Sequence, residues 1–204
     1  MSFFPNKKIW RLFGYFFLLT VSLIILFWSL VSTGFENLKS DLRNNNLRNV
    51  PIEYTKEITN GDVIKIIYKV PESNVLPGDF RYFIKKFRDK LWVLLSRTPK
   101  EKAEIYLLMA DKRMFETTEL IKNQKSENLI LKTLDNSIYN LMEAKKNLLE
   151  EKKKDPYFFR IDQQINQAGL AYEDIVKSLN YKNETINKII NELEIWNEKN
   201  KEYK

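Results

Sequence analysis

The chain of 204 residues contains no cysteine and no histidine. Disulfide bonds are therefore excluded, and a domain outside the cytoplasm would be held together by packing alone. Thiolate and imidazole metal sites are excluded too, as are catalytic arrangements of the Cys-His and Ser-His-Asp types. We expect the chain to bind no metal and no cofactor.

Glycine is scarce, and its five positions are too far apart for any glycine-rich loop that binds nucleotide phosphates. No serine is followed three residues later by lysine, which excludes the common Ser-Lys nucleophile. The segment Asn60-Gly61-Asp62 offers too few oxygen ligands for a calcium loop. We therefore predict that the protein is not an enzyme and has no small-molecule substrate.

One long run without charge is present, from Leu12 to Val31. A helix of this length is about 30 Å long, which matches the hydrocarbon core of a bilayer. Trp10 and Trp28 lie near its two ends, where interfacial tryptophan is common. The sequence predicts a single transmembrane helix, with Trp10, Leu12, Trp28 and Val31 as anchor residues and the lipid bilayer as a partner.

The flanking charges predict the orientation of this span. Lys7, Lys8 and Arg11 precede it, whereas acidic residues offset the basic ones after it. The N-terminus is thus expected in the cytoplasm and the bulk of the chain outside it, in a single-pass protein of the cell membrane. A cleaved signal peptide is the alternative, but its apolar region is usually shorter and ends in small residues.

The remaining sequence divides by composition. We predict a cytoplasmic N-terminus (1–11), the span (12–31), an Asn-rich stalk (32–50), a β-hairpin or extended segment (51–71), a helical domain (76–154) and a C-terminal helix or helix pair (156–204). The fold class is thus mainly α, with one N-terminal transmembrane helix, a short β-hairpin and a bundle of long antiparallel helices. Without Lys7, Lys8 and Arg11 the chain has 31 basic and 27 acidic residues, and this mild positive charge favours anionic neighbours, such as lipid headgroups or wall polymers.

Two β-prone runs flank Asn60-Gly61, which is a strong signal for a tight hairpin turn. Apolar residues recur at every second position within these runs, at Ile52, Tyr54, Ile64, Ile66, Tyr68 and Val70. An isolated hairpin is marginally stable in water, so this one is expected to lie on the helices or on the membrane surface. An extended linker without pairing is the alternative.

The helical domain begins with a stripe of apolar residues at helical spacing: Phe80, Phe83, Ile84, Phe87, Leu91, Leu94 and Leu95. We expect this stripe to face the core. Basic residues are interleaved with the aromatic ones, a pattern that can bind single-stranded nucleic acid. If the aromatic rings are buried, however, only an exposed basic face remains, and we predict no specific nucleic-acid binding. Capping signals at Thr98-Pro99 and Asp155-Pro156 predict the starts of two later helices.

The C-terminal segment carries one apolar heptad frame: Ile161, Ile165, Tyr172, Ile175, Leu179, Ile186, Ile189, Leu193 and Trp196. A break is plausible between Asn180 and Asn183, but the frame continues across it, which favours one helix of about 40 residues. This face is expected to pack on the chain's own helices. Alternatively, it forms a coiled coil with a second copy of the chain or with a protein partner.

Residues 76 to 116 carry a pattern that periodicity alone does not dictate. It comprises Leu76, Pro77, Tyr82, Lys85, Lys86 and Asp89, then Pro99-Lys100-Glu101-Lys102-Ala103-Glu104, and then Leu107, Ala110, Asp111, Arg113, Met114 and Glu116. The pattern resembles a bacterial family of single-span exported proteins of unknown function, over about residues 76–148. Asp89 stands where that family usually has glutamate. The resemblance implies a bacterial envelope protein with no established activity.

These residues are expected to be structural, with Lys85 and Asp89 paired along one helix and Arg113 reaching either Asp89 or Glu116. For function we predict a membrane-anchored extracytoplasmic module that binds another protein or acts as a scaffold. One alternative is an envelope sensor that signals through its span, although the few residues before the span argue against it. The other is a binder of an anionic envelope polymer or lipid surface.

Overall fold

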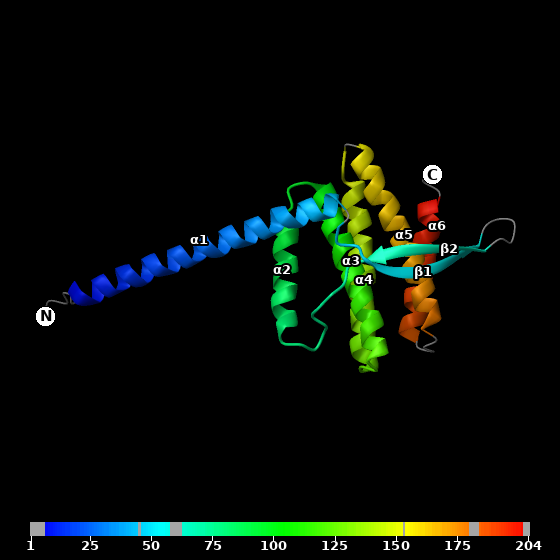
Figure 1. Ribbon diagram of the computed structural model, residues 1–204, viewed down its shortest axis with the longest axis horizontal. Coiled ribbons are helices and arrows are strands. Elements are labelled where there is room, and N and C mark those ends of the chain that lie inside the picture. The colour runs from blue at the N-terminus through cyan, green and yellow to red at the C-terminus, as the bar shows by residue number, and fades with distance from the viewer. Residues whose placement is uncertain (1–6, 45, 58–62, 153, 180–183, 202–204) are drawn as a thin grey trace. The chain divides into compact units, whose positions relative to one another are not determined.

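The computed structural model describes residues 7–44, 46–57, 63–152, 154–179 and 184–201. Its elements, in chain order, are α1 (Lys7–Arg43), β1 (Val50–Glu57), β2 (Val63–Val70), α2 (Arg81–Leu95), α3 (Pro99–Lys122), α4 (Glu127–Leu149), α5 (Pro156–Ser178) and α6 (Glu184–Lys201) (Figure 1). The predicted class is confirmed: the chain is mainly helical, with an N-terminal apolar helix, a two-stranded hairpin and then further helices.

The chain forms two compact units, residues 1–44 and 45–204. In the first unit, α1 is long and apolar enough to cross a membrane. The predicted anchor residues Trp10, Leu12 and Trp28 expose more than half of their surface, as lipid-facing side chains would. The helix continues beyond Val31 to Arg43, and so takes in much of the segment predicted as a stalk.

In the second unit, β1 and β2 pair antiparallel, with Ile52 opposite Tyr68 and Val50 opposite Val70. The hairpin is therefore confirmed, and the unpaired linker is wrong. The predicted Asn60-Gly61 turn lies outside the described residues. Tyr68 and Val70 are buried in the hydrophobic core, so the hairpin packs on the helices as expected for a sheet too small to stand alone.

The helix starts predicted from capping signals are confirmed. The Thr98 hydroxyl accepts a hydrogen bond from the backbone N–H of Glu101 at 3.1 Å, at the start of α3. The Asp155 carboxylate accepts one from the backbone N–H of Phe158 at 2.8 Å, at the start of α5. In both helices proline occupies the first turn, where its missing N–H is not needed.

Helices α3 and α4 lie side by side along most of their length, and α5 and α6 pack beside them (Figure 1). Their contact faces form one core that includes Leu107, Met114, Leu134, Leu141, Ile161, Ile165, Tyr172, Ile175, Ile186, Ile189 and Leu193. Leu179 and Trp196 are partly buried against it. The C-terminal heptad face is thus used within the chain, as expected, and is not free to form a coiled coil without unfolding this core.

The preference for one C-terminal helix of about 40 residues is wrong. Helix α5 ends at Ser178, and α6 packs back against it. The side chain of Lys177 pairs with Glu194 at 2.7 Å, and the Asn197 amide donates to the Gly169 carbonyl at 3.3 Å. The heptad phase survives across the break because both helices turn the same kind of apolar face toward one core.

Gly169 is the position where α6 approaches α5 most closely, since a Cβ there would lie 2.6 Å from the Asn197 amide oxygen and would overlap the Trp196 ring. In an open helix, Gly→Ala stabilises by about 1 kcal/mol. Here we expect Gly169→Ala to lower the free energy of unfolding by about 1–3 kcal/mol, because the methyl group overpacks the contact. Chemical denaturation followed by circular dichroism measures this. The control is Gln163→Ala at an exposed position of α5, and equal or greater stability of Gly169→Ala would contradict the close packing.

Candidate functional site

Helix α2 presents its apolar stripe outward. Phe80, Phe83 and Leu94 are 83, 77 and 75% exposed, and Ile84 and Phe87 are also exposed. The buried residues of the helix are instead the charged Lys85 and Asp89. The prediction that this stripe faces the core is therefore wrong, and so is the argument against nucleic-acid binding that rested on buried aromatic rings.

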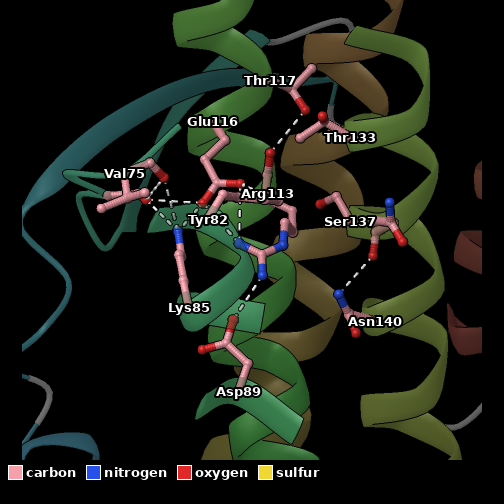
Figure 2. Close-up of polar contacts among 12 residues, drawn as sticks. Val75, Tyr82, Lys85, Asp89, Arg113, Glu116, Thr117, Thr133, Ser137 and Asn140 are labelled. Atoms are coloured by element: carbon pink, nitrogen blue, oxygen red, sulfur yellow. Dashed lines mark hydrogen bonds and ion pairs between the residues drawn. The ribbon is translucent and has the colours of Figure 1, made fainter. Parts of the chain in front are cut away.

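The inward face of α2 is held by charge. Lys85 and Asp89 point toward α3, where their partners are Glu116 and Arg113 (Figure 2). The side chain of Glu116 is fully buried, and those of Lys85, Asp89 and Arg113 are at most 8% exposed. These four residues, with Tyr82 and Ser73, form what we call the α2–α3 ion network.

Glu116 is the centre of this network. One carboxylate oxygen accepts hydrogen bonds from the Lys85 ammonium, from the Ser73 hydroxyl at 2.9 Å and from the Arg113 guanidinium at 2.8 Å. The other accepts from the Tyr82 hydroxyl at 2.9 Å. A buried carboxylate is stable only when its oxygens accept hydrogen bonds in this way.

Arg113 links Glu116 to Asp89. Its second guanidinium nitrogen donates to the Asp89 carboxylate at 2.7 Å, and the other Asp89 oxygen accepts from Arg88 at 2.9 Å. Lys85, Arg113, Glu116 and Asp89 carry two positive and two negative charges, so the buried part of the network is neutral. Balanced charge is what allows a charged helix face to be buried while the apolar face is left outside.

The network shifts the ionisation of its members. Burial lowers the pKa of Lys85, although Glu116 opposes this shift. Burial and Glu116 raise the pKa of Tyr82, so its hydroxyl stays a hydrogen-bond donor. Next to the network, burial lowers the pKa of Lys112 to about 8, with a further contribution from the nearby Arg88.

Five residues singled out in the sequence therefore meet in one network: Tyr82, Lys85, Asp89, Arg113 and Glu116. Arg113 contacts both of the partners considered for it. The expected Lys85–Asp89 pair is replaced by longer-range pairs to α3, because both side chains point into the domain.

The other singled-out residues lie around this network. Ala110 is buried in the core, where its carbonyl accepts a hydrogen bond from Ser137 of α4 at 2.8 Å. Pro77 is buried and Leu76 half-buried just before α2, and Lys86 is exposed on the flank of α2.

A second buried network was not foreseen. The Asp111 carboxylate, fully buried on α3, accepts hydrogen bonds from Tyr68 at 2.9 Å, Tyr172 at 2.7 Å and Arg48 at 3.2 Å. It thereby joins the β-hairpin and α5 to α3. Burial raises the pKa of Asp111, although Arg48 and the two hydroxyls oppose this shift. Asp111 belongs to the pattern noted in the sequence, but its partners are 43 or more positions away, so the pattern did not show what it contacts.

Among the described residues, no group of three or more acidic side chains is placed to hold a metal ion. The described carboxylates of the two networks are each engaged by cations or hydroxyls, an arrangement that fixes helices and leaves no free base. The feature with a chemical use outside the fold is the exposed aromatic and aliphatic face of α2. Two exposed lysines, Lys86 and Lys90, flank that face.

Comparisons with known proteins agree with this outline. No curated protein and no solved structure matches the chain. One family model, described as a domain of unknown function (DUF5667), matches residues 74–202. The match begins just before α2 and runs through α6, and so reaches well beyond the segment in which the sequence pattern was noticed. The chain belongs to the DUF5667 family.

Proposed function

We propose that the chain is a single-pass, membrane-anchored, non-enzymatic module whose outer domain docks on an anionic lipid surface through α2. The observation that carries the proposal is the outward apolar stripe of this helix, formed by Phe80, Phe83, Ile84, Phe87 and Leu94. Soluble monomers rarely expose a contiguous apolar patch of this kind without a binding role.

Charge around the stripe favours a lipid surface over a neutral partner. At 100° per residue, Lys86 and Lys90 lie on one flank of the stripe, and Arg81 and Arg88 lie on the other. An apolar face bordered by basic residues is typical of helices that lie in the headgroup region of anionic bilayers. Each basic residue near such a surface contributes about 1 kcal/mol of attraction.

The N-terminal helix supports the same proposal. A span through the bilayer would keep the domain at high local concentration near lipid, so that weak docking by α2 suffices. The basic residues before the span favour a cytoplasmic N-terminus, with the domain on the outer side of the cell membrane. The family resemblance adds the expectation of a bacterial envelope.

The absence of cysteine makes the full chain suited to site-specific labelling. We expect a nitrobenzoxadiazole label on Phe87→Cys, in full-length protein embedded in nanodiscs, to show blue-shifted emission when the lipid contains phosphatidylglycerol. We then add Lys86→Gln or Lys90→Gln to the labelled chain. Each change should lower the ratio of docked to undocked protein about fivefold, because each removes one lysine from the surface. The measurement is emission wavelength against salt concentration.

Leu149→Cys provides the matched control, because Leu149 is also an exposed apolar residue but lies at the end of α4. Its label should emit as in water in every lipid. Lipid-attached quenchers then identify what covers α2. A blue shift at position 87 that such quenchers do not affect would identify a protein contact instead, and emission as in water at position 87 would refute docking of α2 altogether.

A further inference from the structure

A pocket of about 510 Å³ opens between α2, α3 and α4, on the side of the ion network away from Glu116. Asp89, Arg113 and Asn140 are among its lining residues, and Figure 2 shows Arg113 and Asn140 on the neighbouring helices α3 and α4. This volume falls within the range of small-molecule sites in proteins. The pocket is formed by the described residues alone and does not involve the apolar stripe of α2.

The charge of the pocket is strongly positive. Lys86 and Lys90 of α2, Lys132 of α4 and Arg113 of α3 line it, and Asp89 is its one carboxylate. Asp89 is already paired with Arg113 and Arg88. Within the described part of the chain, the three lysines have no ion-pair partner. They approach the pocket from two facing helices, and so could contact two separate negative groups of one ligand.

The other lining side chains suit a hydroxylated ring. Tyr106 and Tyr139 provide aromatic faces, whereas the Tyr82 ring is already covered by Lys85 and Arg113. The amide nitrogens of Asn136 and Asn140 donate to backbone carbonyls of α4, so their amide oxygens are the groups offered to the ligand. Tyrosine rings pack against the C–H faces of sugars, while amides pair with hydroxyl groups. Lysine, a compact point charge, is a common ligand for phosphate.

We propose that this pocket binds a phosphate-bearing sugar, either as a free molecule or as the terminal unit of an anionic polymer. The lysines bind the phosphate groups, and the tyrosines and asparagines bind the sugar ring. Lys86 and Lys90 also border the apolar stripe of α2, but this inference does not require docking of α2 to lipid, because Lys132, Tyr139 and the asparagines belong to α4.

Isothermal titration calorimetry tests the proposal on the full chain in nanodiscs of zwitterionic lipid, so that no lipid anion competes. The probes are glucose 6-phosphate, glucose, inorganic pyrophosphate and a poly(glycerol phosphate) chain that carries glucose. We expect glucose 6-phosphate to bind and glucose not to bind. Lys132→Ala should weaken binding at least about tenfold, because it removes a charge-assisted contact. Lys146→Ala, at an exposed lysine of the same helix outside the pocket, should leave it unchanged.

Tyr139→Leu separates sugar from phosphate recognition, and Tyr139 is exposed enough that the fold should tolerate the change. It should weaken binding of glucose 6-phosphate and leave that of pyrophosphate unaffected. Tighter binding of the glucosylated polymer than of glucose 6-phosphate would identify a polymer end as the ligand. Tighter binding of glucose 6-phosphate would identify a free sugar phosphate. The proposal is overturned if glucose 6-phosphate does not bind, if glucose binds equally well, or if Lys132→Ala and Lys146→Ala weaken binding to the same extent.

Discussion

Replacing Glu116 with glutamine is expected to lower the free energy of unfolding by about 3–5 kcal/mol, because the change leaves buried positive charge without its main partner. Arg113 would keep its pair with Asp89, and Lys85 would lose the carboxylate with which it pairs. Burial already lowers the pKa of Lys85 with Glu116 present, so losing Glu116 should lower it further. Since Lys85 and Asp89 are the buried residues of α2 and both belong to this network, α2 should detach from α3 before the rest of the domain unfolds.

Amide hydrogen exchange of the full chain measures this directly. Protection of α2 should fall in Glu116→Gln while that of α4 and α5 changes far less. The control is Glu119→Gln on the same helix, where Glu119 is partly exposed and its lysine partner is solvated. This change should lower the free energy of unfolding by less than about 0.5 kcal/mol. Adding Lys85→Gln to Glu116→Gln should recover part of the loss. Unchanged protection of α2 in Glu116→Gln would show that the network does not hold it.

Replacing Arg48 with methionine is expected to destabilise the domain by about 3–5 kcal/mol at neutral pH, because the fully buried Asp111 carboxylate loses the cation that pairs with it. The tyrosine hydroxyls of Tyr68 and Tyr172 would remain as donors, but they carry no compensating charge. Asp111 joins the hairpin, α3 and α5, so the loss should be felt through the whole unit and appear as a lower midpoint of global unfolding.

The pH dependence of this variant has a definite sign. Burial raises the pKa of Asp111 above 3.8 even with Arg48 present, and removing Arg48 should raise it further. A carboxyl with a raised pKa in the folded state binds a proton more tightly there than in the unfolded chain. This tighter proton binding stabilises the folded state fully below pH 3.8. The stabilisation is lost as the pH rises through the folded-state pKa of Asp111. Arg48→Met should thus recover stability on acidification.

Urea denaturation at several pH values checks this prediction. The double variant Arg48→Met and Asp111→Asn, in which neither side chain is charged, should regain much of the stability at neutral pH and lose the acid recovery. If Arg48→Met is equally unstable at pH 4 and pH 7, ionisation of Asp111 is not the cause of its instability.

Local signals in the sequence predicted much of the fold. Capping residues at Thr98 and Asp155 marked helix starts because their side chains act within one turn. Alternating apolar residues on either side of a turn signal predicted the hairpin for the same reason. Each of these interactions joins residues close in the sequence, so the pattern itself contains the information.

The orientation of α2 could not be predicted in this way. An apolar stripe normally faces the core, and here the opposite face is buried because its charges find partners 24 and 31 residues away on α3. A possible signal was the placement of Lys85 and Asp89 on one face of α2, with Arg113 and Glu116 three positions apart on another helix. Only the three-dimensional arrangement shows that these pairs meet. The return of α6 onto α5 escaped prediction likewise, since periodicity does not distinguish a continuous helix from two helices with the same apolar phase.

In the proposed arrangement, α2 turns its apolar face to lipid and its charged face to α3. Spin labels at single cysteines, introduced one at a time from Phe80 to Leu95 in the full chain, test it in bilayers containing phosphatidylglycerol. Oxygen concentrates in lipid. We therefore expect the oxygen accessibility of the labels to oscillate with the helical period and to peak at positions 80, 83, 84, 87 and 94. Peaks at positions 82, 85 and 89 with protected labels at 83 and 87 would contradict it, because the apolar stripe would then be the buried face.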